Sequence, residues 1–547
     1  MRYNLMTRID FRAARATAAA LAMLWLPACG YLGEPEGAQG GSPGEPESFG
    51  ASQAALSPAE QACYSDPRVT SGLVPWSVCA GAALFFNETF GGNGRTCGSC
   101  HPVANNFTID KPFLDTLPAT DPLFIAENRD DAFDLDALEG PDLRGRTLIR
   151  ENLDGLEDAE NKFVLRSVQH IFSLSTTLER DPSDGTSASF VERTGWSGDG
   201  SDDGSLAAFA DGAIRQHLTK SLARGPGDFR LTTPLERANL LAYQLSVGRT
   251  SELDLGHVTF NDPFADPGVD VFTDPLRGRC NECHRNAGGE SASGKNTNFK
   301  NGIEIFSDDT LNRPTFAGVA LRDGGFGGQS LPLPNAAVLD SSPELNGFGD
   351  ESFNTPSLIE VADTGPFFHH NSSGDQDNPA AGLPAAIGFY RDVAFTNSFA
   401  AQALRNQFGG TDISLVGNDF VNLQSFLRAI NVAFNFALAR QRIDAALLLN
   451  QQFWSYRQDI QLGLLRLARV ELEDAVAVCT TTDGPPLFPQ VQADLNALVA
   501  LLQSTELMTS PSARLTATSS AALDIDDLYA AIGTNIELAM GPGNLMF

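Results

Sequence analysis

Two short stretches of the chain carry the same set of reactive side chains. Each holds two cysteines three positions apart, followed directly by a histidine: Cys97, Cys100 and His101 in the first, Cys280, Cys283 and His284 in the second. On a helix, positions i, i+3 and i+4 share one face, so two thiols can reach the vinyl groups of a haem while the imidazole reaches its iron. This C-x-x-C-H pattern is typical of c-type haem attachment. We therefore expect two covalently bound haem c groups.

The same residue types have other uses. A C-x-x-C pair is also typical of a thiol redox centre, and with a neighbouring histidine it can form half of a zinc site. One such pentapeptide arises by chance in a chain of this composition with a probability on the order of one in a thousand, and two arise far more rarely. The repetition favours haem c over both alternatives.

The N-terminus has the pattern of an export signal. Residues 1–28 place several arginines before a short apolar run, which ends in LPAC at Cys29. A small residue before Cys29 resembles a bacterial lipoprotein signal, in which that cysteine becomes the lipidated terminus. An ordinary cleaved signal that contains a cysteine is the alternative. We expect a periplasmic or cell-surface protein whose contact with the membrane is a lipid anchor at Cys29.

Three of the eight cysteines are then left over: Cys63, Cys79 and Cys479. Cys63 and Cys79 flank a short loop, and an oxidising compartment permits a disulfide between them. Cys479 would be a buried thiol or would pair between chains.

The formal charge of −31 argues against binding to nucleic acid or to anionic lipid. It favours cationic partners, or it only keeps an exported protein soluble.

Helical spacing recurs along the chain, so the fold is expected to be mainly α. Residues 205–222 and 234–245 show it, and the second segment has the start signals Thr233, Pro234 and Glu236. We predict two tandem cytochrome c-like haem domains with long loops and a C-terminal helical extension. The boundaries place a signal peptide at 1–28, a flexible tether at 29–58, the two haem domains at 59–250 and 251–434, and the extension at 435–547.

Three segments resemble the bacterial diheme cytochrome c peroxidase and MauG superfamily. They are ALFFNETFGGNGRTCGSCH around the first motif, RTGWSGDG between the motifs, and FNTPSLIEVADTGPFFHH after the second. The resemblance runs from about residue 82 to 434. It implies that His101 is the proximal ligand of a catalytic haem and His284 that of an electron-relay haem. Trp196 falls where the family has an indole between the porphyrins; a purely structural tryptophan is the alternative.

The resemblance also raises the question of the sixth ligand of the second iron, which is methionine in the peroxidases and tyrosinate in MauG. The second module contains no methionine, and Tyr390 matches the ligand position. A core or surface tyrosine is the alternative. His369 matches a family histidine beside the relay haem, and His370 stands where an Asp or Asn is usual.

The distal side of the first haem departs from the family. No histidine lies between His101 and His170, which implies an open iron. The acid–base glutamate of the family aligns with Gln216 or Thr219, neither of which is a carboxylate. His217 lies between them and could move a proton, although a hydrogen-bonded structural histidine is the alternative.

A calcium ion lies between the domains of relatives. The backbone carbonyls of Thr364 and Pro366 match its ligands, but Ser167 replaces an asparagine.

The sequence thus predicts an exported diheme oxidoreductase that uses hydrogen peroxide at the His101 haem and relays electrons through Trp196 to the haem of His284 and Tyr390. Its electron donor would be a small redox protein or a protein substrate. The alternatives are a diheme dioxygenase of the rubber-oxygenase type, which would use oxygen and which the missing distal carboxylate favours, and a non-catalytic electron carrier.

Overall fold

The structure is a computed structural model, and it describes residues 56–125, 142–151, 164–178, 192–196, 198, 205–290, 296, 298–303, 315–316, 319–320, 352–374, 382–453 and 457–546. The expected signal peptide, Cys29 and the tether up to residue 55 lie outside the described residues. Leu56–Phe547 form one compact unit. Within the described part, no helix is both long enough and apolar enough to cross a membrane.

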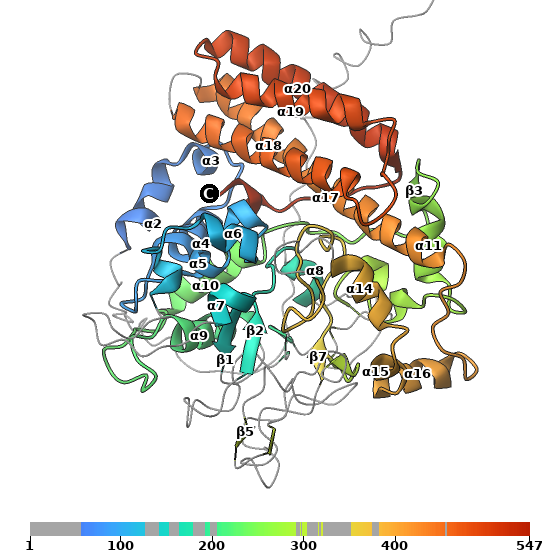
Figure 1. Ribbon diagram of the computed structural model, residues 1–547. Coiled ribbons are helices and arrows are strands. Elements are labelled where there is room, and N and C mark those ends of the chain that lie inside the picture. The colour runs from blue at the N-terminus through green and yellow to red at the C-terminus, as the bar shows by residue number, and fades with distance from the viewer. Residues whose placement is uncertain are drawn as a thin grey trace, which may run out of the picture. The chain divides into compact units, whose positions relative to one another are not determined.

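The fold is mainly helical, as the spacing predicted (Figure 1). The described strands are short antiparallel pairs: β1 (Leu148–Glu151) with β2 (Val164–Ser167), β3 (Thr259–Phe260) with β8 (Gly533–Thr534), β4 (Asn298–Phe299) with β7 (Phe353–Asn354), and β5 (Thr315–Phe316) with β6 (Val319–Ala320). The division into two tandem haem domains stays a prediction.

The helices of the N-terminal part surround the first motif. They are α2 (Pro58–Ala62), η1 (Cys63–Ser65), α3 (Pro67–Thr70), α4 (Trp76–Asn87), α5 (Cys97–Cys100), η2 (Val103–Asn105), α6 (Lys111–Thr116), η3 (Pro122–Phe124), α7 (Asp142–Arg146), α8 (Leu174–Leu178), α9 (Leu206–His217) and α10 (Pro234–Gln244). Thr233 and Glu236 form the expected capping box of α10. A disulfide joins Cys63 to Cys79, as the spacing suggested.

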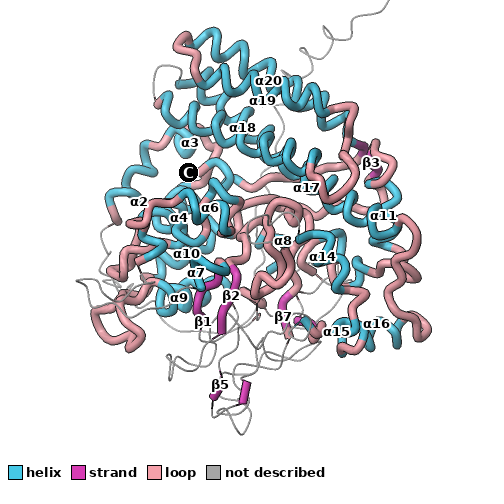
Figure 2. The backbone as a smooth tube through the Cα atoms, viewed as in Figure 1, coloured by secondary structure: helices cyan, strands magenta, loops and turns pink. Residues whose placement is uncertain are grey.

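The second motif begins a group of shorter helices. They are α11 (Ala265–Thr273), η5 (Cys280–Glu282), η6 (Arg285–Ala287), α14 (Gly382–Phe389), α15 (Val393–Thr396) and α16 (Phe399–Gln407). Much of the segment 352–374 is loop (Figure 2). The loop-rich character of this module agrees with its many Gly, Asn and Pro residues.

Both motifs adopt one helical turn rather than a longer helix. His101 (φ −116°, ψ 65°) and His284 (φ −121°, ψ 68°) lie just past their turns in nearly the same non-helical conformation. Each is followed by two consecutive residues with left-handed φ, Asn106 and Phe107 in the first module and Asn286 and Ala287 in the second. The two modules therefore repeat a backbone pattern and not only a sequence pattern.

Long helices cover one end of the molecule (Figure 1). They are α17 (Asp419–Phe453), α18 (Gln458–Thr480), α19 (Gln492–Glu506) and α20 (Pro511–Ile532), and a short helix η9 (Pro542–Leu545) follows. The predicted boundary at residue 434 falls inside α17. Cys479 is a fully buried free thiol in α18. The predicted extension is thus packed into the same core as the motif-bearing parts.

The chain end is held by hydrogen bonds to the first module. Gly248 N–H donates to Asn544 Oδ1 at 2.6 Å, and Asn544 Nδ2 donates to Gly248 O at 2.9 Å. Arg68 in α3 donates to Leu545 O at 2.7 Å. Asn544 has no exposed surface. Its side chain therefore satisfies the buried amide of Gly248, while the carbonyl of Gly248 also accepts from Gly541 N–H at 2.8 Å.

Replacing Asn544 with Ala should lower the free energy of unfolding by about 1–3 kcal/mol, because the buried N–H of Gly248 loses its hydrogen-bond partner. Chemical denaturation of the full chain measures the change. Asn496→Ala is the matched control, because the Asn496 side chain is exposed and bonds only within α19. Equal effects of the two substitutions would show that the Asn544 contacts do not stabilise the chain end.

Candidate functional site

Each motif lies in the wall of a large cavity. The first cavity is lined by Cys97, Cys100 and His101 and encloses about 1130 Å³ of empty space. The second cavity is lined by Cys280, Cys283 and His284 and encloses about 1480 Å³. Most of the other lining side chains are apolar. Part of this space is open to solvent. A mainly apolar lining with a few polar groups is typical of a cofactor site.

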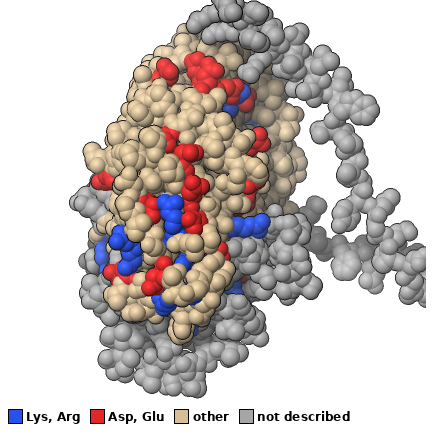
Figure 3. All heavy atoms as spheres, turned by 90° about the vertical axis from the view of Figure 1, so that its right-hand side faces the viewer, with Lys and Arg blue, Asp and Glu red and all other residues tan. Residues whose placement is uncertain are grey.

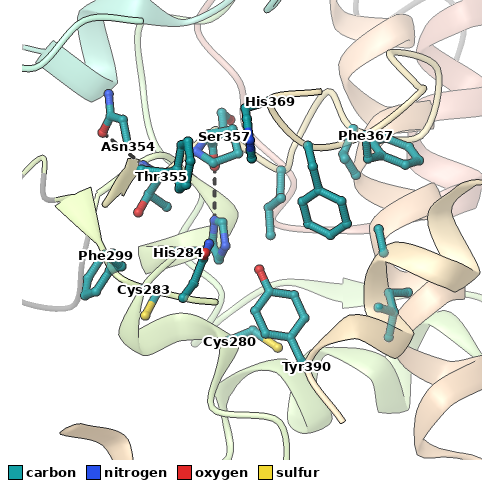
Figure 4. A pocket seen from close by; sticks show the side chains of 18 of the residues that line it. Cys280, Cys283, His284, Phe299, Asn354, Thr355, Ser357, Phe367, His369 and Tyr390 are labelled. Atoms are coloured by element: carbon teal, nitrogen blue, oxygen red, sulfur yellow. Dashed lines mark hydrogen bonds between the residues drawn. The ribbon is translucent and has the colours of Figure 1, made fainter. Parts of the chain in front are cut away.

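The two histidines are oriented in the same way. His101 Nδ1 lies 2.8 Å from the backbone carbonyl of Phe107, and His284 Nδ1 lies 3.0 Å from that of Pro356 (Figure 4). A carbonyl can only accept, so each Nδ1 carries the hydrogen and Nε2 is left as the nitrogen that can bind a metal. Desolvation lowers the pKa of both imidazoles to about 4, although the carbonyl bonds oppose the shift. Both rings are therefore neutral, the form that ligates iron.

The four motif cysteines are free thiols and form no disulfide with each other. Desolvation raises the pKa of Cys97, Cys280 and Cys283 to about 12. A thiol redox centre needs a lowered thiol pKa, so these values disfavour that alternative. The described residues contain no group of three His, Cys, Asp or Glu side chains placed to hold a metal ion by itself. The thiols and the imidazole fit covalent haem attachment.

The two cavities are separated by a shared wall, consisting of Ser167, Val168, Gln169, His170 and Trp196, all of which line both. Trp196 Nε1 donates to Ser167 O at 3.0 Å, which fixes the indole. The backbone of Ser167 is fixed in turn, because its N–H donates to His369 O at 2.7 Å. Trp196 thus lies between the cavities, where the resemblance expects it.

Tyr390 lies in the second cavity and its hydroxyl points into the space beside His284 (Figure 4). Phe389 and Phe395 pack against its ring. Desolvation, with smaller contributions from Cys283 and Cys280, raises the pKa of Tyr390 above its ordinary value. A tyrosinate at this position therefore requires a positive charge, such as a metal ion, next to its oxygen.

His369 and His370 are both buried. Of the two, only His369 lines the second cavity. The His369 ring is stacked between Phe353 and His370, with ring centres 4.0 Å apart on each side. The stacking fixes the orientation of the His369 ring. Figure 4 shows His369 and Tyr390 on different sides of the cavity.

The residues of the expected calcium site lie close together. Thr364 and Pro366 line the second cavity beside Ser167. The Ser167 hydroxyl donates to Phe368 O at 2.9 Å. The Thr364 hydroxyl donates to Glu360 O at 2.8 Å. Calcium at the two backbone carbonyls stays a prediction.

His217 is the one of three aligned candidates that lines the first cavity; Gln216 and Thr219 do not. Consecutive helical positions point about 100° apart, so the end of α9 directs only one of them inward. Among the described residues nothing bonds to Nδ1 of His217. Desolvation, helped by Arg95 and Arg224, lowers the pKa of His217 to about 3. The ring is therefore neutral.

Three polar residues of the first cavity escape the sequence motifs: Glu151, Gln244 and His170. Glu151 ends β1, and its carboxylate lies 3.7 Å from Arg166 Nε on the paired strand β2. A carboxylate therefore lines the cavity, although none occupies the aligned positions. Glu151 and His101 line the same cavity although about fifty residues separate them, and no local signal in the sequence could have indicated this.

Comparison with known proteins adds nothing to this picture, because no family model, curated protein or solved structure matches the chain.

Replacing Tyr390 with Phe tests its position as a ligand, because the change removes only the hydroxyl. If that oxygen is the sixth ligand of a second iron, the low-spin EPR signal of that iron should disappear and a high-spin signal should replace it. Tyr64→Phe is the control, since Tyr64 is 63% exposed. A Tyr390→Phe spectrum identical to that of the unmodified protein would exclude the tyrosinate.

Proposed function

We propose that the chain is an exported diheme c-type oxidoreductase that consumes hydrogen peroxide at the haem of His101 and exchanges electrons with the haem of His284 and Tyr390. One observation carries the proposal. Two C-x-x-C-H histidines, each fixed through Nδ1 to a backbone carbonyl, lie in two cavities that share a wall containing Trp196. This is the arrangement that two electronically coupled iron sites require.

Haem iron, when bound, supplies the redox chemistry. The chain supplies neutral imidazoles on the proximal side, Tyr390 as the oxygen ligand of the second site, and largely apolar walls that exclude water. Trp196 offers an aromatic ring between the sites, held by its bond to Ser167.

Proton transfer to and from peroxide needs an acid–base group in the first cavity. Besides the proximal His101, the acid–base candidates of the described lining are Glu151, His170 and His217. Desolvation lowers the pKa of His170. The lowered pKa of His217, about 3, makes its ring a poor base near neutral pH. We assign the proton to the Glu151 carboxylate, which Arg166 holds, and a hydrogen-bonding role to His217.

Glu151 also bears on the dioxygenase alternative, which the missing distal carboxylate favoured. A carboxylate lines the first cavity, which weakens that reason. The electron-carrier alternative has one observation in its favour. His170 and His217 bring two further imidazoles to the cavity of His101, and either nitrogen could close the sixth position of an iron.

Export is supported by the Cys63–Cys79 disulfide, which suits an oxidising compartment. We propose a lipid anchor at Cys29 and an electron donor that is a small redox protein or a protein substrate. Figure 3 shows one face of the molecule, on which acidic and basic side chains are interspersed within a largely uncharged surface. The net charge of −31 is therefore not gathered into one acidic patch on that face.

An EPR titration of the ferric protein with one equivalent of hydrogen peroxide tests the function. We expect one high-spin and one low-spin signal at the start, and both should decrease together because the two sites share the oxidation. A protein with two low-spin signals and no reaction with peroxide would be an electron carrier instead. Oxygen uptake with an apolar substrate, without a reaction with peroxide, would indicate the dioxygenase.

Replacing Glu151 with Gln should slow peroxide consumption by about 10²-fold or more, because the cavity loses its carboxylate. His217→Gln keeps a hydrogen-bonding group and should slow it by less than about tenfold. Stopped-flow absorbance at the haem bands measures both rates. If His217→Gln has the larger effect, the proton belongs to His217 and our assignment is wrong.

A further inference from the structure

His170 lies in the shared wall and has no role in the proposed chemistry. It lines both cavities. Its Nδ1 is buried, and no described residue forms a hydrogen bond with it. A buried ring nitrogen left without a partner costs about 1–3 kcal/mol, so native proteins nearly always provide one.

The charged groups nearest to His170 are already bonded to each other. Arg249 Nε donates to Glu360 Oε1 at 3.1 Å, and Ser173 and Ser357 donate to the two oxygens of the same carboxylate at 2.7 Å. Arg249 and Glu360 are both fully buried. The charges of Arg249 and Glu360 are thus neutralised within this network, whereas His170 faces the two cavities.

A haem brings few hydrogen-bonding groups into a pocket. Its ring edge is hydrocarbon, and its polar groups are two propionate carboxylates, which accept hydrogen bonds. Desolvation lowers the pKa of His170, so the ring is neutral and keeps one N–H to donate. A neutral donor and a carboxylate acceptor match in charge and direction.

We propose that His170 donates a hydrogen bond to a haem propionate at the shared wall and thereby sets the reduction potential of that haem. The inference rests on the proposed haem content but not on the reaction with peroxide. His170 acts as a positioning residue, because it contacts the edge of the cofactor and not its iron. A hydrogen bond draws negative charge away from the propionate, and its loss should stabilise the ferric state.

The test compares full-length, haem-loaded variants by spectroelectrochemical titration. In His170→Phe, the ratio of ferrous to ferric iron at one haem, at a fixed potential, should fall about three- to tenfold. His170→Asn retains an N–H donor and should restore most of the ratio.

Val168→Ala changes another residue of the shared wall without changing a polar group, and it should leave the ratio within about twofold. If His170→Phe does not fold, His170→Leu removes the same donor with a smaller side chain.

Two results would overturn the inference. One is an unchanged ratio at both haems in a variant with full haem content. The other is a change from low spin to high spin in its EPR spectrum, which would make His170 an iron ligand. The proposed function fails separately, if the purified protein has no haem or if its open iron ignores peroxide. A haem-loaded protein whose iron ignores peroxide still has a measurable reduction potential. A failure of the proposed function can therefore be distinguished from a failure of this inference.

Discussion

The candidate site depends on one shared wall. Residues 167–170 and Trp196 separate the two cavities. Trp196 donates a hydrogen bond to Ser167 O within this wall, and Ser167 donates to the carbonyls of Phe368 and His369, which holds the wall against that segment. These five residues therefore border both cavities at once.

Buried polar contacts fix the relative position of the modules on either side of the wall. Arg249, at the end of the first module, pairs with Glu360 of the second, and neither residue has exposed surface. Removing one partner of such a pair leaves an uncompensated buried charge, which is strongly destabilising. The chain end reinforces the same place, because Asn544 bonds to Gly248, the residue before Arg249. The chain end at η9 thus packs beside the residues between the cavities, and α17 lines the second cavity with Leu423 and Leu427.

The ionisation states of the lining follow from the same burial. Desolvation keeps His101, His284 and His217 neutral and the motif thiols protonated. It also disfavours a phenolate at Tyr390, so a metal ion is needed to form one. Burial in an apolar cavity therefore favours the neutral forms of these side chains. Glu151 is the exception, and Arg166 lies beside it.

The sequence by itself determined the local features, because they depend on neighbouring residues. These are the two C-x-x-C-H turns, the capping box of α10, the short Cys63–Cys79 loop and the mainly helical class. Only the tertiary structure decided which distant side chains meet. The pairing of β1 with β2 places Glu151 at the first cavity, and His170 lines both cavities. The direction of α9 at its end turns His217, and not Gln216, toward the first cavity. Such contacts depend on packing between segments tens to hundreds of residues apart, which periodicity and spacing do not encode.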